Sequence, residues 1–272
     1  MIDPFHIQGP ALISFSGGRT SGYMLHRIIR AHNGVLPKDV IPCFANTGKE
    51  LPETLRFVQD CDDYWGNRVR WVEWRDTESG FEEVGSNSAS HKGEPFAALI
   101  KKKGMPPNWQ ARFCTSFLKV NAMTAFARSL GWTPGNYSEV IGLRHDEGIR
   151  IFKMMERNEQ DGRKCIAPLA KAQVTKCDVT EFWDRQAFDL DLESGEGNCD
   201  LCFLKGRGLR KQMIRDEPGR ADWWIEQEES VGGWFDKRDS YRSLKLEVKR
   251  QPDFFVDMSD EHDVECGLQC QS

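Results

Sequence analysis

A short stretch near the start of the chain has the composition of a phosphate-binding loop. It reads Ser16-Gly17-Gly18-Arg19-Thr20-Ser21. Glycines let backbone N–H groups approach an anion, and a following helix adds unpaired donors and the positive end of its dipole. The hydroxyls add hydrogen bonds, and the arginine adds a guanidinium fork. An ordinary glycine-containing turn between a strand and a helix remains the alternative interpretation.

Nine cysteines give the chain a second possible chemistry. In a cytosolic protein, clustered cysteines favour metal or redox chemistry over disulfides. The pair Cys199-x-x-Cys202 has a spacing that both zinc and iron–sulfur sites use. Four isolated cysteines are expected to be core or incidental residues: Cys43, Cys61, Cys165 and Cys177.

Strands and amphipathic helices alternate along the chain. Apolar runs predict strands at 11–14, 39–45, 69–74, 137–143 and 165–169. Helical spacing predicts helices at 22–30, 51–65, 94–103 and 115–130, and one from an Asp178 N-cap to residue 188. We expect a loop at 79–93 and irregular structure from 232 onward. This alternation is typical of a doubly wound, mostly parallel α/β sheet with right-handed crossovers.

Polar turns follow three of the predicted strands. Asn46-Thr47-Gly48 follows the second strand, and Gly142-x-Arg144 ends the fourth. Ligands of parallel sheets bind beyond the carboxyl ends of the strands. We therefore expect these turns to share one edge of the sheet with the 16–21 loop.

Composition limits the function classes. The chain has 272 residues, a net charge of −5 and 39% hydrophobic residues, which suits a large α/β domain and does not favour broad nucleic-acid binding. No apolar run approaches the roughly 20 residues that span a bilayer. The first residues lack a charged and then apolar leader. We therefore expect a cytoplasmic protein without a membrane association.

Five motifs in order make the chain resemble the PP-loop superfamily, and within it the phosphoadenosine-phosphosulfate (PAPS) reductase-like family. The resemblance spans roughly residues 10 to 210. Its motifs are Ser16-Gly-Gly-x-x-Ser21, Asn46-Thr-Gly-Lys-Glu-Leu-Pro-Glu-Thr54, Arg112-Phe-Cys-Thr-x-x-Leu-Lys119, Gly142-Leu-Arg144 with Glu147, and Cys199-x-x-Cys202. The resemblance implies an adenine-nucleotide hydrolase-like fold that binds an adenylyl nucleotide (PAPS, APS or ATP) across the sheet edge.

The resemblance also implies roles for individual residues. Arg144 would reach the phosphate or phosphosulfate, with Lys119 assisting, and Arg19 would neutralise its charge. A surface salt bridge with Asp146 or Glu147 is the alternative for Arg144. The cofactor-binding set would comprise Ser14, Ser16, Gly17, Gly18, Arg19, Thr20, Ser21, Asn46, Thr47, Gly48 and Gly142.

The resemblance implies a metal centre as well. A [4Fe–4S] cluster would be bound by Cys114, Cys199 and Cys202, with Cys270 or Cys266 or a non-protein ligand as the fourth, and structural zinc is the alternative. The tail Glu265-Cys-Gly-Leu-Gln269 resembles that of sulfonucleotide reductases. Cys266 would attack the sulfur of a phosphosulfate, and a thioredoxin-type reductant would release sulfite.

Three functions follow as hypotheses. The leading one is a PAPS/APS reductase-like enzyme that uses cysteine thiolates. The second is an ATP-dependent PP-loop sulfurtransferase or adenylating enzyme acting on nucleic acid, held by the basic segment from Lys205 to Arg215; a solvated helix face is the other interpretation of that segment. The third is a non-catalytic nucleotide- or metal-binding protein.

The motifs divide the chain into two expected parts. Residues 1–190 would form the nucleotide-binding α/β domain. Residues 191–272 would form a cysteine-containing, mostly helical extension packed on that domain.

Overall fold

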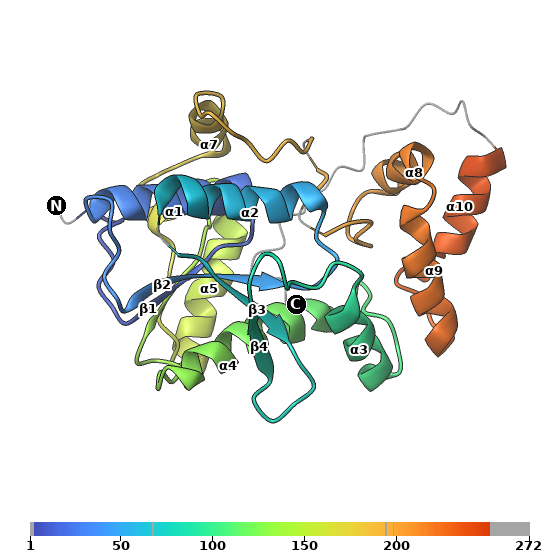
Figure 1. Cartoon of the computed structure of the whole chain (residues 1–272), viewed down its shortest axis with the longest axis horizontal. Coiled ribbons are helices and arrows are strands. Elements are labelled where there is room, and N and C mark those ends of the chain that lie inside the picture. Colours follow the sequence, from blue (N-terminus) through green and yellow to red (C-terminus); the bar gives the residue numbers. More distant parts are fainter. Residues whose placement is uncertain (1–2, 67, 194, 198, 251–272) are drawn as a thin grey trace.

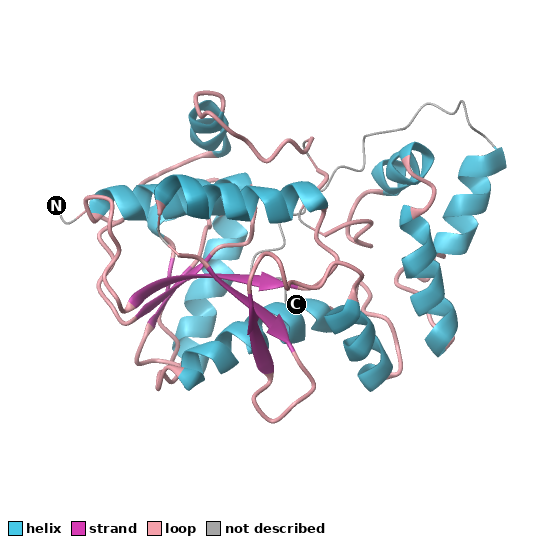
Figure 2. Ribbon diagram, viewed as in Figure 1, coloured by secondary structure: helices cyan, strands magenta, loops and turns pink. Residues whose placement is uncertain are grey.

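A six-stranded sheet lies at the centre of the fold (Figure 2). The computed structural model describes residues 3–66, 68–193, 195–197 and 199–250. The sheet order is β4-β3-β2-β1-β5-β6, and every neighbouring pair is parallel except β3 and β4. The strands are β1 (Ala11–Ser14), β2 (Val40–Asn46), β3 (Arg70–Trp74), β4 (Phe81–Val84), β5 (Ser138–Val140) and β6 (Cys165–Ile166). The predicted doubly wound, mostly parallel α/β sheet is confirmed.

Helices cover both faces of the sheet (Figure 1). Helices α1 (Arg19–Ala31) and α2 (Pro52–Trp65) lie on one face. The other face carries a π-helical segment, η1 (Thr115–Asn121), which continues into α4 (Ala122–Ser129), and α5 (Gly148–Asp161). α1 buries Met24, Leu25 and Ile28 at helical spacing against the sheet. This packing positions the first turn of α1, which includes the last residues of the 16–21 loop.

Three helices pack together beside the sheet: α8 (Arg207–Asp216), α9 (Arg220–Val231) and α10 (Tyr241–Arg250). Their shared core contains Trp224, Phe235 and Tyr241. Phe96, on α3 (Glu94–Lys103), packs edge-on against both Trp224 and Phe235. The aromatic cluster therefore joins this helical unit to the rest of the fold. The predicted division at residue 190 stays a prediction.

The structure corrects two predicted elements before residue 170. The expected loop at 79–93 contains β4, which pairs antiparallel with β3 through Trp71 and Val84. The predicted strand at 165–169 ends after two residues, because Pro168 begins the short helix α6 (Pro168–Lys171). Helix α5 was not predicted from the sequence, since its exposed side carries apolar side chains that obscure the amphipathic period.

Two further corrections concern the second half. Helix α7 is Lys176–Trp183, and its N-cap is Thr175 rather than Asp178. Asp178 occupies the third helical position and completes a capping box, because its carboxylate accepts from the Thr175 backbone N–H at 2.7 Å. The segment after 232 is also more regular than expected, since α10 buries Tyr241, Leu244 and Val248 against α8 and α9.

Candidate functional site

The 16–21 loop follows β1 and runs into the first turn of α1, which begins at Arg19. Gly17 has a φ of +77°, and a Cβ at this position would lie 2.7 Å from the Thr54 side chain, so only glycine fits without strain. Ser21 organises the turn: its hydroxyl donates to the Gly18 carbonyl and lies 2.9 Å from the Ser16 hydroxyl. Gly18 is the N-cap of α1, so the first-turn N–H groups of α1 point toward this loop.

Arg144, which lies in the turn after β5, contacts the same loop. Its guanidinium is buried, at 6% exposure, and its Nη1 donates to the Thr20 hydroxyl at 3.0 Å. Its Nε donates to Asp146 at 3.0 Å, so the salt-bridge alternative is also realised. Gly142 packs against the start of α1, since a Cβ there would lie 3.4 Å from the Ser21 Cα. The structure therefore brings the predicted Arg144, Thr20, Ser21 and Gly142 together.

Two carboxylates, Asp146 and Glu147, lie next to the Arg144 guanidinium. Burial raises the pKa of Asp146, but the neighbouring Arg144 guanidinium outweighs it and holds that pKa below its ordinary value. The backbone N–H of Arg144 donates to Glu147 at 2.8 Å. The arginine is thus held in one orientation, with one edge toward the loop.

Arg19 pairs with a carboxylate from a distant segment of the chain. Its guanidinium forms a two-pronged ion pair with Asp189 and donates to the Leu192 carbonyl at 2.9 Å. The Asp189 hydrogen bond raises the pKa of Arg19. The Trp183 indole N–H also donates to the Arg19 carbonyl at 2.8 Å. Arg19 therefore fastens the segment after α7 onto the start of α1. Sequence reasoning missed Asp189, since it lies 170 positions away.

The Asn46 turn is held by a buried carboxylate that the sequence analysis missed. Glu73, on β3, has no exposed surface and accepts from the Asn46 amide at 2.6 Å and from the Ser90 hydroxyl at 2.7 Å. It also pairs with Arg75 at 2.6 Å. The Asn46 side-chain oxygen, Oδ1, accepts from the Gly48 N–H at 3.0 Å. A glutamate within the apolar strand Arg-Trp-Val-Glu-Trp was the available signal.

Lys119 lies next to this turn. Glu50 accepts from both the backbone N–H and the hydroxyl of Thr47 at 2.9 Å, and the Lys119 ammonium lies 3.9 Å from the Glu50 carboxylate. Lys119 is buried, at 7% exposure. The turn after β2 and a cation from η1 therefore meet at Glu50.

The Cys199-x-x-Cys202 segment docks onto the same turn. Cys199 forms a β-bridge with Glu50, and the Asp200 N–H donates to the Lys49 carbonyl at 2.7 Å. The buried Lys205 ammonium donates to the Cys199 carbonyl at 2.7 Å. Burial lowers the pKa of Lys205, while the nearby Cys202 and Cys199 sulfurs act to raise it. Both cysteines of the motif therefore lie beside a buried cation.

The predicted cluster ligands are not assembled in the described part of the chain. Among the residues that the structure describes, no group of three or more His, Cys, Asp or Glu residues is arranged to hold a metal ion. Cys114 immediately precedes η1 and is partly buried. Cys266 and Cys270 lie outside the described residues. The described residues alone therefore show no complete iron–sulfur or zinc site.

The basic segment 205–215 is exposed only in part: Arg207 has a 44% exposed side chain, whereas three other cations are buried. Lys205, Arg210 and Lys211 are buried, at 2%, 1% and 6% exposure. Arg210 pairs with Asp236, and Lys211 pairs with Glu247. These cations hold α8 against the turn before α10 and against α10 itself. The phosphate-binding role of this segment stays a prediction, and acidic neighbours already pair with Arg210 and Lys211.

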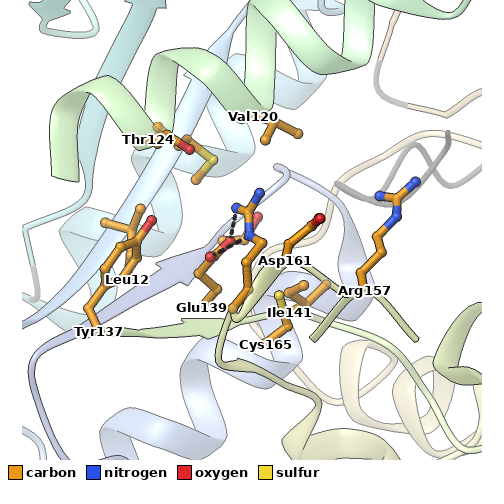
Figure 3. A pocket seen from close by; sticks show the side chains of 12 residues that line it. Leu12, Val120, Thr124, Tyr137, Glu139, Ile141, Arg157, Asp161 and Cys165 are labelled. Carbon is orange, nitrogen blue, oxygen red and sulfur yellow. Dashed lines mark hydrogen bonds and ion pairs between the residues drawn. The ribbon is translucent and has the colours of Figure 1, made fainter. Parts of the chain in front are cut away.

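A cavity of about 120 Å³ lies over β1, β5 and β6 (Figure 3). Ser14 lines it, so this residue faces the cavity as well as preceding the loop. Its wall includes the Glu139–Arg163 ion pair, whose Nε–Oε1 distance is 2.8 Å. Burial raises the pKa of Cys165 and of Tyr137, each to about 12. Cys165 therefore stays a thiol at neutral pH.

The other isolated cysteines show no sign of function. Burial raises the pKa of the Cys43 and Cys61 thiols far above the ordinary value, and both belong to the main core. Cys177 is exposed. None of the described helices is long and apolar enough to cross a bilayer.

Comparison with known proteins finds a phage protein that is similar to this chain. No family model matches it. Over 216 residues it is 31% identical to the uncharacterized nin region protein ORF290 of Escherichia phage lambda, which covers 76% of this chain and 70% of the phage protein. The chain belongs to the family of this phage protein.

Two more distant similarities accompany this one. An uncharacterized protein of Methanocaldococcus jannaschii, MJ0066, is 25% identical over 158 residues, 56% of this chain and 27% of that protein. A crystal structure of PAPS reductase from Candida auris, in complex with phosphate, superposes with a TM-score of 0.41 and 17% identity, over 67% of this chain and 79% of that chain. This structural likeness is too distant to bear on the reaction.

Proposed function

We propose that the chain binds an adenylyl nucleotide at the carboxyl edge of β1, β2 and β5 and carries out sulfur chemistry with cysteine thiolates, as a PAPS/APS reductase-like enzyme. The observation that carries this proposal is the contact between Arg144 and the 16–21 loop. A buried guanidinium, the hydroxyls of Ser16 and Ser21 and the first turn of α1 converge there. Such a combination suits a phosphate group.

The loop itself carries no carboxylate that would repel a phosphate group. The loop from residue 16 to residue 21 contains no acidic residue, and Thr20 hydrogen-bonds to Arg144. Two lysines lie near the turn after β2. The Lys119 ammonium is 3.9 Å from Glu50, and the Lys49 ammonium is 3.3 Å from Asp200. A nucleotide across this edge would have cations at both ends.

Cys266 would supply the nucleophile. Its thiolate sulfur would bond to the sulfonate sulfur of the nucleotide, the bond from that sulfur to the phosphate oxygen would break, and the nucleotide would leave with the electron pair. One thiolate of a thioredoxin-type dithiol would then attack the Cys266 sulfur, forming a mixed disulfide and releasing sulfite with the electron pair of the broken S–S bond. The second thiol would resolve this mixed disulfide, which oxidises the reductant to a disulfide and regenerates the Cys266 thiol. The roles of Cys114, Cys199 and Cys202 as cluster ligands stay predictions, which iron, sulfide and zinc analysis of anaerobically purified protein would test.

The decisive assay offers PAPS, APS and ATP separately with a dithiol reductant and measures sulfite and pyrophosphate. We expect sulfite from a sulfonucleotide, and a loss of sulfite in Cys266→Ser but not in Cys177→Ser, a matched change at an exposed cysteine. Sulfite release that persists in Cys266→Ser would exclude the nucleophile. Pyrophosphate from ATP without sulfite would exclude reductase chemistry.

A further inference from the structure

Two exposed tryptophans lie on segments that contact each other. Trp109 is 42% exposed and Trp234 is 55% exposed, and Met105, on the same loop as Trp109, is 39% exposed. Large aromatic side chains that remain half in solvent on neighbouring segments commonly mark an interaction site. We call this surface, formed by Lys103, Met105, Trp109, Trp234, Lys237 and Arg238, the tryptophan surface.

The tryptophan surface is built from two segments that are far apart in sequence. One is the loop after α3, and the other is the turn between α9 and α10. They touch directly, since a Cβ on Gly233 would lie 2.7 Å from Pro106. The Arg238 guanidinium carbon lies 5.9 Å from the centre of the Trp109 ring. Figure 1 shows α9 beside α3, so the surface joins the helical unit to the α/β part.

Positive charge accompanies the aromatic rings. Lys103 and Lys237 are exposed. The Lys103 ammonium lies 4.0 Å from the centre of the Phe117 ring. Arg238, whose side chain is 75% exposed, shares the Asp236 carboxylate with the buried Arg210. The Arg238 guanidinium is thus an exposed cation beside the Trp109 ring. The apolar side chains of the surface are therefore interleaved with cations.

We propose that the tryptophan surface binds single-stranded nucleic acid. Unpaired bases expose the flat faces that can stack on Trp109 and Trp234, whereas bases in a duplex are stacked on one another. The ammonium groups of Lys103 and Lys237 would contact the phosphates. A protein partner is less favoured, because cations rather than further apolar residues separate the rings. The surface is separate from the nucleotide site, and neither proposal depends on the other.

The test measures binding of a fluorescein-labelled 20-nucleotide oligo-dT by anisotropy, with a duplex of equal length and poly-glutamate as comparison ligands. We expect the single strand to bind more tightly than either comparison ligand. Trp109→Ala and Trp234→Ala should each weaken binding roughly fivefold to a hundredfold. Phe152→Ala, at a 62% exposed ring on α5, is the matched control and should change affinity less than twofold.

Salt dependence tests the cations separately. Lys237→Ala should reduce the slope of log affinity against log salt by about 0.7, the value for one phosphate contact on a single strand. Lys153→Ala on α5 is the control. Thermal melting confirms that each variant is folded. Equal affinity for poly-glutamate, no binding of oligo-dT, or a loss of self-association rather than of oligo-dT binding in Trp234→Ala would overturn the proposal.

Discussion

Glu228 makes the stability of the helical unit depend on pH. Its carboxylate is 5% exposed on α9 and accepts from the backbone N–H groups of Phe235 at 3.2 Å and Tyr241 at 3.0 Å. Burial raises the pKa of Glu228 to about 7 from an ordinary value of 4.5, despite these two donors and the nearby Arg210. The folded protein therefore holds the proton more tightly than the unfolded chain does.

The direction and size of the effect follow from that difference. Because the folded-state pKa is raised, the favourable contribution is fully present below pH 4.5 and is lost as the pH rises through about 7. At about 1.4 kcal/mol per pKa unit, the free energy of unfolding should fall by on the order of 3 kcal/mol across this interval.

Urea denaturation of the wild type and Glu228→Gln at pH 5, 6, 7 and 8 measures this directly. The glutamine cannot accept both backbone N–H groups, which costs roughly 1–3 kcal/mol at every pH. The informative quantity is the change with pH of the difference between the two proteins. We expect that difference to shift in favour of Glu228→Gln by on the order of 3 kcal/mol from pH 5 to pH 8. A difference that stays constant over the four pH values would refute the reasoning.

Three further outcomes are expected. Arg19→Ala should lower the free energy of unfolding by about 1–2 kcal/mol and change nucleotide affinity less than threefold, because Asp189 already uses its guanidinium; a larger affinity loss in titration calorimetry would restore its predicted phosphate role. Glu73→Ala should cost about 3–5 kcal/mol in chemical denaturation, since it leaves the Arg75 charge and the Asn46 amide without their buried partner; a cost below 1 kcal/mol would contradict this. Iodoacetamide at pH 8 should modify Cys177 and leave Cys43, Cys61 and Cys165 unmodified in the native protein, because burial raises their pKa values; early labelling of Cys165 in peptide mass spectra would show that its thiol is accessible and ionised.

Local pattern was sufficient to predict the core of the fold. The strand at 11–14, the glycine loop after it and the helix that follows are consecutive, so side-chain periodicity and turn chemistry carry the information. The positions of Asn46 and Arg144 followed from the rule that parallel strands present their carboxyl ends at one edge. Sequence reasoning therefore brought Arg144 to the same edge as Thr20.

Long-range pairing was beyond reach of the sequence alone. Nothing local to Arg19 indicates that Asp189 will take its charge, and nothing local to α8 shows that Arg210 will be buried against Asp236. A run of basic residues suggests a solvated or phosphate-binding face unless the acidic partners from other segments are known. The tryptophan surface was missed for the same reason, since Trp109 and Trp234 belong to segments that meet only in the folded chain.

Titration calorimetry of the purified full chain with PAPS, APS and ATP tests the central claim most directly. We predict that at least one of these nucleotides binds, and that Arg144→Ala weakens its binding roughly tenfold to a hundredfold, the effect of removing a charged hydrogen-bond donor. Arg163→Ala should leave affinity unchanged, since this arginine is also paired with a carboxylate but precedes β6 rather than following a strand. Absence of binding by all three nucleotides, or equal affinity of wild type and Arg144→Ala, would contradict a nucleotide site at this edge.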